Sequence, residues 1–380
     1  MDKKILVINA HDINTGAGRS CFSTLQLLSK QGCQIVHVAR FKGQIENHLE
    51  KIGIKTIYCD FPGWFPQMNS NGKKMNIIQR LRSILHSLRV NHSSLKIVCG
   101  QLKKMNFTPD LIYTNTILWY MGLFLSRKYK CPHYYHIREY GMDDFGMYFV
   151  LGRKMSSLLA NIYTKKAFCI SKGVQEAWKD FFGDKAILMY NGISVPKIAY
   201  CEHHYCRESF RIILVGRLSI EKGQRSVITQ LPQIISKSSQ NIVLDLYGTG
   251  SDENNLKQLV SDLSLNGIVN FCGFSENIDY SKYHLAVMSS KSEGFGRTTI
   301  EYMFNSVPVV GYKGGATPEL IEDGLTGKLY SNDVEFVDIV CEAIANYSKF
   351  AEYAKNAFAN AVDHFSLDAY RENILKEFRN

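Results

Sequence analysis

Short runs of consecutive apolar residues recur along the chain, separated by segments in which apolar positions have helical spacing. In the first half these runs lie at residues 4–10, 33–40, 109–116, 132–140 and 168–170. In the second half they lie at residues 211–223, 241–250, 270–274, 284–290 and 307–312. Apolar runs of this kind are typical of strands buried in a parallel sheet. The pattern therefore predicts two α/β halves, each with its own sheet.

An irregular stretch near the middle of the chain separates the two halves. Residues 195–209 show no clear periodicity and contain Pro196, which is typical of a linker. A chain of 380 residues also exceeds the usual size of a single hydrophobic core. We therefore predict an N-terminal domain over residues 1–197 and a C-terminal domain over residues 198–364. A last helix, over residues 365–380, is predicted to cross back to the N-terminal domain.

Local signals predict several boundaries within the first half. Residues 13–20 are interpreted as a glycine-containing loop, and residues 23–32 as the helix that follows it. The apolar spacing of residues 158–167 predicts a helix before the strand at 168–170. Ser171 comes directly after that strand and is typical of a helix N-cap.

Gly16 and Gly18 follow the first predicted strand and raise the question of a dinucleotide site. They match the start of the dinucleotide fingerprint, but Cys21 replaces its third glycine. The acidic residue expected at the end of the second strand is also absent, because that strand ends in Arg40. An arginine there still suits a phosphorylated dinucleotide. An NADP-dependent oxidoreductase therefore stays open as an alternative.

The stretch EGFGRTTIE places Glu293 and Glu301 on either side of a glycine-rich turn. It follows one apolar run and precedes another, so the turn is expected at the carboxyl edge of the sheet, where ligands bind. Gly294 and Gly296 allow close approach of backbone to a ligand, and a helix that begins at Thr298 offers N–H groups to a phosphate. Thr298 and Glu301 also have the spacing of a capping box. On spacing alone, Glu301 is either a helix cap or a ligand contact.

Two other sets of residues are candidates for binding or catalysis. Arg217 and Lys222 flank the loop after the strand that begins at residue 211, a spacing that could bring both cations onto one anion. His136 lies at the far end of the strand at 132–140, again at the edge where ligands bind. A histidine in a strand is more often a core residue, so its sequence position leaves both interpretations open.

The net charge of +10 is unevenly distributed, since residues 1–198 carry +16 and the remainder carries −6. Residues 61–109 contain eight Lys and Arg and no acidic residue, and apolar positions at helical spacing interleave with these charges. Such a segment suits an anionic membrane surface. The alternative, also open for residues 73–104, is a solvated helix whose apolar face packs on its own domain. No recognition motif accompanies the charge, so we predict no nucleic-acid partner.

The ten cysteines are scattered and include no C-x-x-C pair. The closest pair, Cys201 and Cys206, encloses His203 and His204 in a stretch interpreted as an exposed loop, and we predict no metal site there. No apolar run reaches the length of a membrane span, and the amino terminus is interpreted as a first strand rather than a signal peptide. Together these features predict reduced thiols in the cytoplasm.

Several motifs occur in an order that resembles a known family. In the second half these are GRLSIEKG, YGTG, EGFGRTTIE and GGATPELI; in the first half they are the Gly16 and Gly18 loop, HIRE, ISKGV and YNGI. They resemble the retaining GT-B glycosyltransferases of family 4, the group 1 glycosyl transferases, over nearly the whole chain. The most specific elements are Glu293 and Glu301 at their spacing, together with Arg217 and Lys222. The resemblance implies two Rossmann-like domains that face each other across a cleft.

The resemblance also implies a role for each candidate residue. Arg217 and Lys222 would neutralise the donor diphosphate, Glu293 would contact the transferred sugar, and Glu301 would bind the ribose. His136 would contact the transferring sugar as well. The implied donor-binding residues are Gly16, Gly18, Gly248, Gly250, Phe274, Phe295, Gly296, Arg297, Thr298 and Glu301. Arg297 departs from the family pattern, because an aliphatic residue is more usual there.

The leading hypothesis is a retaining glycosyltransferase of bacterial surface polysaccharide synthesis on the cytoplasmic face of the membrane. The implied donor is a UDP- or GDP-sugar, and the implied acceptor is a saccharide, in particular one carried on a lipid pyrophosphate. No metal and no cofactor are implied. The alternatives are a GT-B sugar-nucleotide epimerase that needs no acceptor, and a non-catalytic protein that binds sugar nucleotides.

Overall fold

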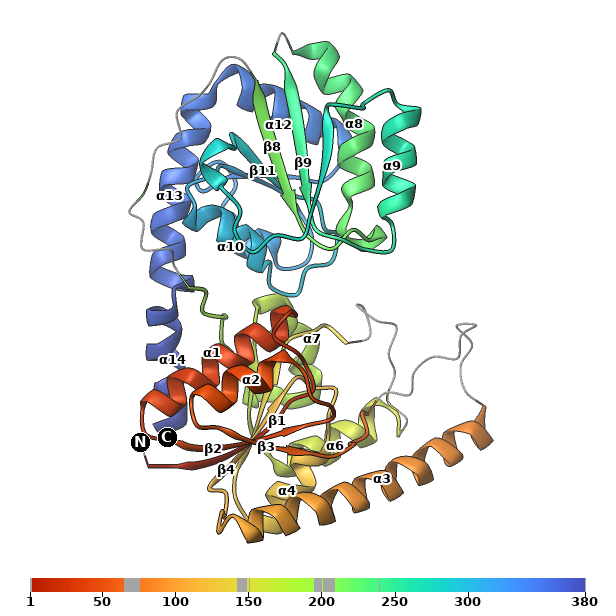
Figure 1. Ribbon diagram of the computed structural model, residues 1–380, viewed down its shortest axis with the longest axis vertical. Helices are drawn as coiled ribbons and strands as arrows, with labels where there is room; N and C mark the ends of the chain where they lie inside the picture. Colours follow the sequence, from red (N-terminus) through yellow and green to blue (C-terminus); the bar gives the residue numbers. More distant parts are fainter. Residues whose placement is uncertain are drawn as a thin grey trace. The chain divides into compact units, whose positions relative to one another are not determined.

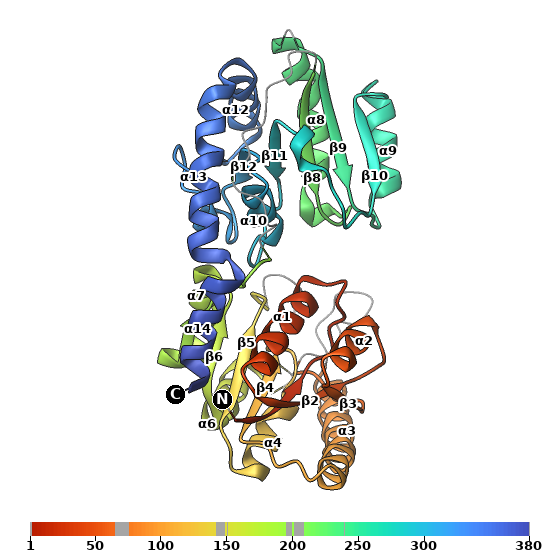
Figure 2. The same cartoon turned by 60° about the vertical axis from the view of Figure 1, so that its left-hand side comes forward.

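The computed structural model describes residues 2–64, 76–141, 149, 151–194, 200, 209–238 and 240–379. Residues 201–206, with their cysteines and histidines, and most of the predicted linker lie outside the described residues. The chain divides into two compact units (Figures 1 and 2). The first unit comprises Met1–Asn191 and Arg371–Asn380, and the second comprises Gly192–Tyr370.

The first unit is built on a seven-stranded parallel sheet of order β3-β2-β1-β4-β5-β6-β7. Its strands are β1 (Lys4–Ile8), β2 (Gln34–Ala39), β3 (Lys55–Tyr58), β4 (Leu111–Asn115), β5 (His133–Ile137), β6 (Thr164–Cys169) and β7 (Ala186–Leu188). The strand order reverses between β1 and β4, where Ile8 is the register partner of Thr114. In parallel sheets the loops that follow two such strands are the usual place for a ligand.

Helices lie on both sides of this sheet (Figure 1). They are α1 (Gly16–Lys30), α2 (Gln44–Lys51), α3 (Ile77–Lys104), α4 (Met121–Tyr129), α6 (Arg153–Tyr163), α7 (Lys172–Phe182) and the short 3₁₀ helix η1 (Gly183–Lys185). Val98 of α3 and Met121 of α4 join Leu6, Ile8 and Val36 in one buried apolar cluster. Burial of these side chains holds α3 and α4 against the sheet.

The last helix of the chain, α14 (Leu367–Arg379), ends on the first unit. Lys3 Nζ donates a hydrogen bond of 2.5 Å to the carbonyl oxygen of Phe378, and Lys166 Nζ lies 2.9 Å from the Glu377 carboxylate. The Phe378 ring is buried and meets Tyr134 edge-on, with ring centres 5.4 Å apart. Apolar contact and charge together hold the end of α14 on this sheet.

Two predicted boundaries in the first unit are wrong. Helix α1 begins at Gly16, inside the predicted loop of residues 13–20, because Thr15 caps it and accepts a hydrogen bond from Gly18 N. The helix predicted over residues 158–167 ends at Tyr163, and β6 takes over at Thr164. Pairing with β5 and the contact between Lys166 and α14 determine that second boundary. The predicted N-cap at Ser171 is confirmed.

The second unit contains a six-stranded parallel sheet of order β10-β9-β8-β11-β12-β13. Its strands are β8 (Phe210–Val215), β9 (Ile242–Tyr247), β10 (Val269–Gly273), β11 (Leu285–Met288), β12 (Val309–Tyr312) and β13 (Lys328–Tyr330). Its helices are α8 (Gln224–Lys237), α9 (Glu253–Asp262), α10 (Arg297–Phe304), α11 (Thr317–Leu320), α12 (Asp333–Ala345) and α13 (Tyr347–Phe365), with 3₁₀ helices η2 (Ile220–Lys222) and η3 (Tyr280–Lys282). Here the strand order reverses between β8 and β11.

Two parallel sheets, each covered by helices, confirm the predicted α/β class with two Rossmann-like domains. Each sheet has a reversal point where the loops of two strands that are distant in sequence come together. Among the described residues, no helix combines enough length and apolar character to cross a membrane.

Candidate functional site

The loops after β8 and β11 meet at the reversal point of the second sheet. Ser289 Oγ donates to the carbonyl oxygen of Lys222 at 2.7 Å. Gly223 directly follows Lys222 and has a φ of 73°. A Cβ on Gly223 would lie 2.3 Å from the carbonyl oxygen of Ser289. Only glycine suits that close approach in the left-handed conformation. This contact brings Lys222 against the loop that carries Glu293.

Lys222 and Glu293 form an ion pair at this point. Lys222 Nζ lies 2.6 Å from Glu293 Oε2, and the two side chains are 29% and 18% exposed. The carbonyl oxygen of Glu293 accepts a hydrogen bond of 2.8 Å from Ala316 N, which fixes the loop from the other side. Because an ammonium group has three donors, Lys222 can hold Glu293 and still donate to a second anion.

Arg217 precedes η2 on the same loop and is exposed. The pKa of the neighbouring Glu221 carboxyl lies below its usual value, first because of the polar hydroxyl of Ser219 beside it and also because of the charges of Arg217 and Lys222. Both cations therefore act on one carboxylate already present in the protein. The predicted contact of Arg217 and Lys222 with a diphosphate stays a prediction.

Helix α10 begins at Arg297, with Gly296 at its N-cap position, rather than at Thr298 as predicted. Gly296 has a φ of 83° and makes no side-chain cap. The capping-box interpretation of Thr298 and Glu301 is therefore wrong. Because Gly296 ends the turn in a left-handed conformation, the first N–H groups of α10 have no acceptor within the helix. They give this end of the helix a partial positive charge next to Glu293.

Glu301 is paired within its own helix. Arg297 Nε lies 3.0 Å from Glu301 Oε1, and both side chains are about one quarter exposed, at 25% and 28%. Arg297, the departure from the family pattern, thus contacts the carboxylate that is predicted to bind the ribose. The structure brings five residues to the loops and the start of α10 at one edge of the second sheet, and we call them the second-unit cluster: Arg217, Lys222, Glu293, Arg297 and Glu301.

A glycine turn after β9 lies directly against the loop that carries Arg217. A Cβ on Gly248 would lie 2.0 Å from the Gly216 carbonyl oxygen, and one on Gly250 would lie 2.1 Å from the Leu218 carbonyl oxygen. Only residues without a side chain fit here. Both predicted glycines therefore border the cluster through their backbone.

The two predicted phenylalanines differ in exposure. Phe274, just after β10, is 63% exposed, so its ring is available to a ligand. Phe295 is buried, and its ring centre lies 6.1 Å from that of Phe365. Because its ring is buried, any donor contact by Phe295 would be made by its backbone.

Two tyrosines near the cluster were not predicted. Tyr302 is buried on α10, and its hydroxyl oxygen accepts a hydrogen bond of 2.7 Å from Val215 N at the end of β8. Burial, and next the charge of Glu301, raise the pKa of the Tyr280 phenol. Tyr302 follows Glu301 directly in the sequence, but nothing in its apolar surroundings distinguishes it from a core aromatic residue.

In the first unit, the predicted sugar contact His136 lies in the interior. Its side chain has no exposed surface, and Nδ1 lies 2.5 Å from the Tyr113 hydroxyl. The ring meets Phe168 edge-on at 5.9 Å. Burial, and then the charge of Arg138, hold the pKa of His136 well below its usual range. A sugar contact by His136 stays a prediction, and the buried position favours a structural role.

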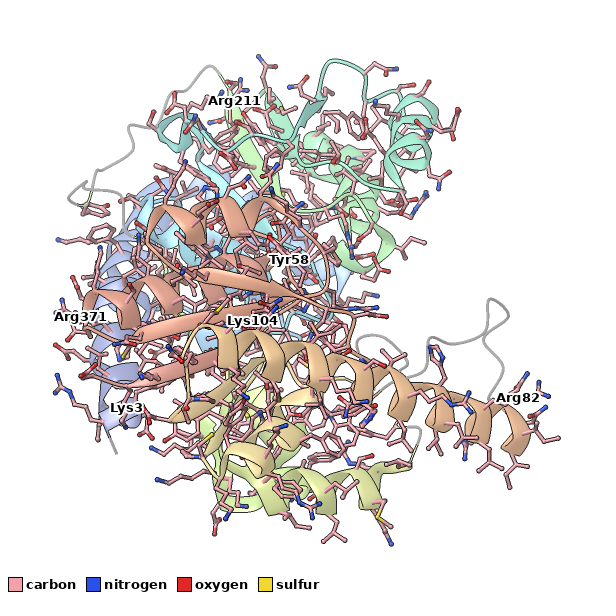
Figure 3. All side chains as sticks on the ribbon, turned by 60° about the horizontal axis from the view of Figure 1, so that its bottom comes forward. Lys3, Tyr58, Arg82, Lys104, Arg211 and Arg371 are labelled. Atoms are coloured by element: carbon pink, nitrogen blue, oxygen red, sulfur yellow. The ribbon has the colours of Figure 1, made fainter. Side chains whose placement is uncertain are left out.

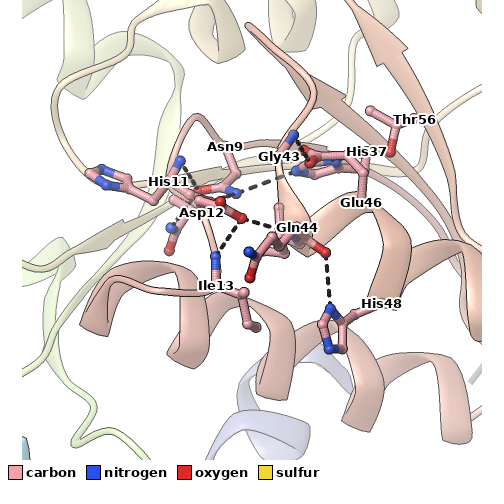
Figure 4. Close-up of polar contacts among 12 residues, drawn as sticks. Asn9, His11, Asp12, Ile13, His37, Gly43, Gln44, Glu46, His48 and Thr56 are labelled. Carbon is pink, nitrogen blue, oxygen red and sulfur yellow. Dashed lines mark hydrogen bonds and ion pairs between the residues drawn. The ribbon is translucent and has the colours of Figure 1, made fainter. Parts of the chain in front are cut away.

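Gly16 and Gly18 lie in the first turn of α1. The loop directly before this helix is fixed by hydrogen bonds to Asp12. Asp12 Oδ1 accepts a hydrogen bond of 2.7 Å from Ile13 N (Figure 4). It accepts a second one, of 2.8 Å, from Ile45 N. A Cβ on Gly18 would lie 1.8 Å from the Asp12 carbonyl oxygen, so this loop requires a glycine at that position. Around Gly16, by contrast, a Cβ would meet nothing within 4 Å. The start of α1 is therefore open at Gly16.

A second polar group, which was not predicted, lies at the same edge of the first sheet. Arg138 follows β5 and hydrogen-bonds to Asn115 and Asn191. Asn115 in turn donates to Asn9 Oδ1 at 2.9 Å, and Asn9 hydrogen-bonds with the His11 backbone. Side chains at or just after the ends of four strands thus form one polar network, which sequence spacing alone does not reveal.

These features can be compared with known proteins. Residues 207–360 match the family model of the glycosyl transferases of group 1. The matched range contains the whole second-unit cluster. This part of the chain is therefore similar to that family.

Curated relatives extend the similarity toward the amino terminus. The poly(glycerol-phosphate) alpha-glucosyltransferase of Bacillus subtilis is 24% identical over 283 residues, which cover 72% of this chain and 41% of that protein. The GtfA subunit of the UDP-N-acetylglucosamine–peptide N-acetylglucosaminyltransferase of Streptococcus gordonii is 27% identical over 188 residues, which cover 46% of this chain. The match covers 36% of that subunit. The chain thus spans less than half of the length of these relatives.

A solved structure matches the whole chain. The Anabaena protein Alr3699/HepE in complex with UDP has a TM-score of 0.77, with 20% sequence identity and 99% of both chains covered. A likeness at this identity concerns the fold. It confirms the predicted GT-B fold class.

Proposed function

We propose that the protein transfers a sugar from a nucleotide-activated donor to an acceptor and retains the anomeric configuration. The ion pair of Lys222 and Glu293 beside the N-terminal end of α10 carries the proposal, because it places a cation, a carboxylate and the positive end of a helix dipole at one sheet edge. Similarity supports it too. The Bacillus subtilis relative is named as a glucosyltransferase, and the Anabaena protein has been crystallised with UDP and with UDP-glucose.

The donor is proposed to be a UDP- or GDP-sugar bound by the second unit. Arg217 and Lys222 would contact the diphosphate, Glu293 the sugar and Glu301 the ribose. The backbone at Gly248 and Gly250 and the exposed ring of Phe274 would lie by the base. The proposal also places the backbone of Phe295, Gly296, Arg297 and Thr298 against the sugar or phosphate.

The difficult step of such a transfer is the departure of the diphosphate. The bond between the anomeric carbon and the diphosphate oxygen breaks, and negative charge accumulates on the leaving group. Positive groups placed in advance lower the barrier by stabilising that charge. Each charge-assisted hydrogen bond from Arg217 or Lys222 contributes roughly 1.5–3 kcal/mol. We propose that these cations and the end of α10 act without a metal ion or a cofactor.

We propose a saccharide acceptor, carried on a lipid pyrophosphate, in the synthesis of a bacterial surface polysaccharide. The protein would then work at the cytoplasmic face of the membrane. An apolar stripe on the first half of α3 supports this, because its side chains are exposed: Ile77, Ile78, Leu81, Leu85 and Leu88. The second half of α3 instead packs on the sheet through Val98 and Leu102. The membrane-binding interpretation therefore fits the first half of α3, and the interpretation of a helix packed on its own domain fits the second half.

Positive charge accompanies the exposed stripe. Helix α3 carries six Lys and Arg and no acidic residue, and Figure 3 shows Arg82 and Lys104 toward its two ends. Helix α6 adds Arg153 and Lys154 and exposes Met155, Leu158 and Ile162. Lys73 and Lys74 of the predicted basic segment lie outside the described residues. A basic, apolar surface of this kind suits anionic lipid headgroups.

We expect the protein to bind vesicles that contain phosphatidylglycerol and to bind neutral phosphatidylcholine vesicles much more weakly, in a co-sedimentation assay. Each basic residue near the surface adds roughly 1 kcal/mol of attraction. Replacing Leu81 and Leu85 together by glutamate should weaken binding about tenfold or more, because it removes apolar contact and adds repulsion. Val334→Glu is the control, since Val334 is an exposed apolar residue of α12. Equal binding to both kinds of vesicle would contradict the proposal.

The donor proposal predicts a selective thermal shift. UDP, GDP, ADP and TDP, with and without attached sugars, should be compared by differential scanning fluorimetry. A nucleotide at 100 times its dissociation constant adds roughly 2.7 kcal/mol to the stability of the unit that binds it. We expect UDP or GDP and its sugars to raise the melting temperature. If no member of the panel shifts it, the proposed function is wrong.

Product analysis with the selected donor then separates transfer from epimerisation. A transferase leaves the donor sugar unchanged without an acceptor, whereas an epimerase converts it into an isomer. The anomeric proton in the NMR spectrum of the product reports retention. An isomer formed from donor alone would favour the epimerase.

A further inference from the structure

The guanidinium of Arg138 is buried in the first unit, and its hydrogen-bond acceptors among the described residues are neutral. Only 8% of the residue is exposed. Nε donates to Asn115 Oδ1 and Nη1 to Asn191 Oδ1, both at 2.6 Å, and both acceptors are neutral amides. Among the described residues, Nη2 has no hydrogen-bond partner and Arg138 forms no ion pair. A buried charge without a partner is unfavourable in the free protein.

The charge acts on the groups around it. Burial is the main cause that lowers the pKa of His11 to about 4, and Arg138 lowers it further. Arg138 also contributes to the low pKa of His136, after burial. His11 Nε2 is buried and, among the described residues, has no hydrogen-bond partner. Among the described residues, three side chains at this sheet edge therefore have a buried nitrogen without a hydrogen-bond partner: Arg138 at Nη2, His11 at Nε2 and His136 at Nε2.

The network places Arg138 close to the start of α1. Asn115, which accepts from Arg138, donates its own amide N–H to the carbonyl oxygen of Ala17 at 3.4 Å. Helix α1 has 15 residues, and its first N–H groups have no acceptor within the helix. Thr15 caps only Gly18 N, and the space beside Gly16 is open. A buried cation and a helix N-terminus thus lie at one sheet edge.

We propose that Arg138, together with the N-terminal end of α1, binds a negatively charged oxygen group of the substrate, a carboxylate or a phosphate. The planar guanidinium suits both groups because it donates two parallel hydrogen bonds, and helix N-termini bind the same anions. This inference rests on the proposed function and adds a substrate class to it. The saccharide held by the first unit is an acidic sugar or a phosphorylated one.

Binding of small anions tests the proposal without an activity assay. The histidine NMR signals of the full-length chain should be followed while sodium D-glucuronate, inorganic phosphate or neutral D-glucose is added. We expect one of the two anions to bind and to raise the pKa of His11, because a bound anion neutralises Arg138. Glucose should do neither. Preference for glucuronate identifies a carboxylate substrate, and preference for phosphate identifies a phosphorylated one.

Variants test the role of the guanidinium. Arg138→Gln should weaken binding of the preferred anion at least tenfold and raise the pKa of His11 without any ligand. Arg127→Gln, at an exposed position of α4, is the matched control and should leave both unchanged. Arg138→Lys keeps the positive charge but loses the planar guanidinium that donates two parallel hydrogen bonds. This variant replaces Arg138→Gln in the test if Arg138→Gln does not fold. Its binding should fall below that of the wild type.

The proposal is wrong if neither anion binds more tightly than glucose, or if the Arg138 variants bind as well as the wild type. Nucleotide binding, measured by thermal shift on the same samples, separates this outcome from a failure of the proposed function. Loss of anion binding with intact nucleotide shifts overturns only the assignment of Arg138. Absence of nucleotide shifts in the wild type overturns the donor proposal.

Discussion

Replacing Lys222 by alanine is expected to lower the turnover number at least about tenfold, because the loss of one charge-assisted hydrogen bond to the leaving diphosphate costs roughly 1.5–3 kcal/mol. Arg217→Ala and Glu293→Ala should lower it to a similar extent, the first by removing a second cation and the second by removing the sugar contact. Release of free nucleotide from the donor selected in the thermal-shift panel measures the rate. Lys237→Ala is the control, since Lys237 pairs with Asp338 at an exposed position of α8. Unchanged turnover in all three variants would overturn the assignment.

A double variant separates catalysis from structural support. If the ion pair of Lys222 and Glu293 served only stability, each single variant would leave one charge unpaired, and the double variant would recover part of the loss. If both residues act on the donor, the double variant stays inactive even where its melting temperature recovers. Glu293→Gln adds a further comparison, because it keeps a hydrogen-bonding side chain but removes the negative charge that pairs with Lys222.

The first unit is expected to lose much of its stability between pH 7 and pH 5. Burial lowers the pKa of His37 and of His133 to about 3, and burial together with Arg138 lowers that of His11 to about 4. In the unfolded chain these side chains take up a proton near pH 6.5, whereas the folded unit holds them neutral. Below pH 6.5 the unfolded state therefore binds more protons, and the free energy of unfolding falls as the pH falls.

The expected loss is large relative to the stability of a domain. Each of the three histidines contributes roughly 1.4 kcal/mol per pH unit, which gives roughly 6 kcal/mol at pH 5. Domains are typically stable by roughly 5–15 kcal/mol. Urea unfolding followed by tryptophan fluorescence reports on this unit alone, because Trp64, Trp119 and Trp178 all belong to it.

Histidine variants show which residue causes the pH dependence. His133 hydrogen-bonds to Thr114 at 2.8 Å and to Thr164 at 3.1 Å, so His133→Gln should lower stability at pH 7 but flatten its dependence on pH. His92→Gln changes an exposed residue of α3 and should leave the dependence unchanged. Equal urea midpoints at pH 7 and pH 5 in the wild type would contradict this prediction.

Much of the fold was predictable because its strands are short apolar runs. The strands β9, β11 and β12 lie within predicted runs, β8 begins one residue before its predicted run, and the N-cap at Ser171 follows from a local rule. Boundaries that depend on distant contacts were not predictable. Strand β6 begins at Thr164, within a run that has helical spacing, because β5 and α14 lie beside it.

The candidate site divides in the same way. Glu293, Glu301, Arg217 and Lys222 were found from their spacing, since loops after parallel strands lie at one edge. The left-handed Gly296 moved the start of α10 and removed the capping-box interpretation. Arg138 was not found, because its significance depends on burial of its guanidinium and on the neutral amides to which it hydrogen-bonds among the described residues, which no local pattern expresses.

Composition and periodicity were thus enough to establish two parallel α/β units and the residues at their loop ends, because burial of strands and helix faces follows local patterns of apolar residues. Tertiary structure decided which of those residues carry an unbalanced charge. His136, the expected sugar contact, is packed against Tyr113 and Phe168, while Arg138 two positions later lies among neutral amides. Burial and pairing of charge depend on residues far apart in the chain, so only the folded protein reveals them.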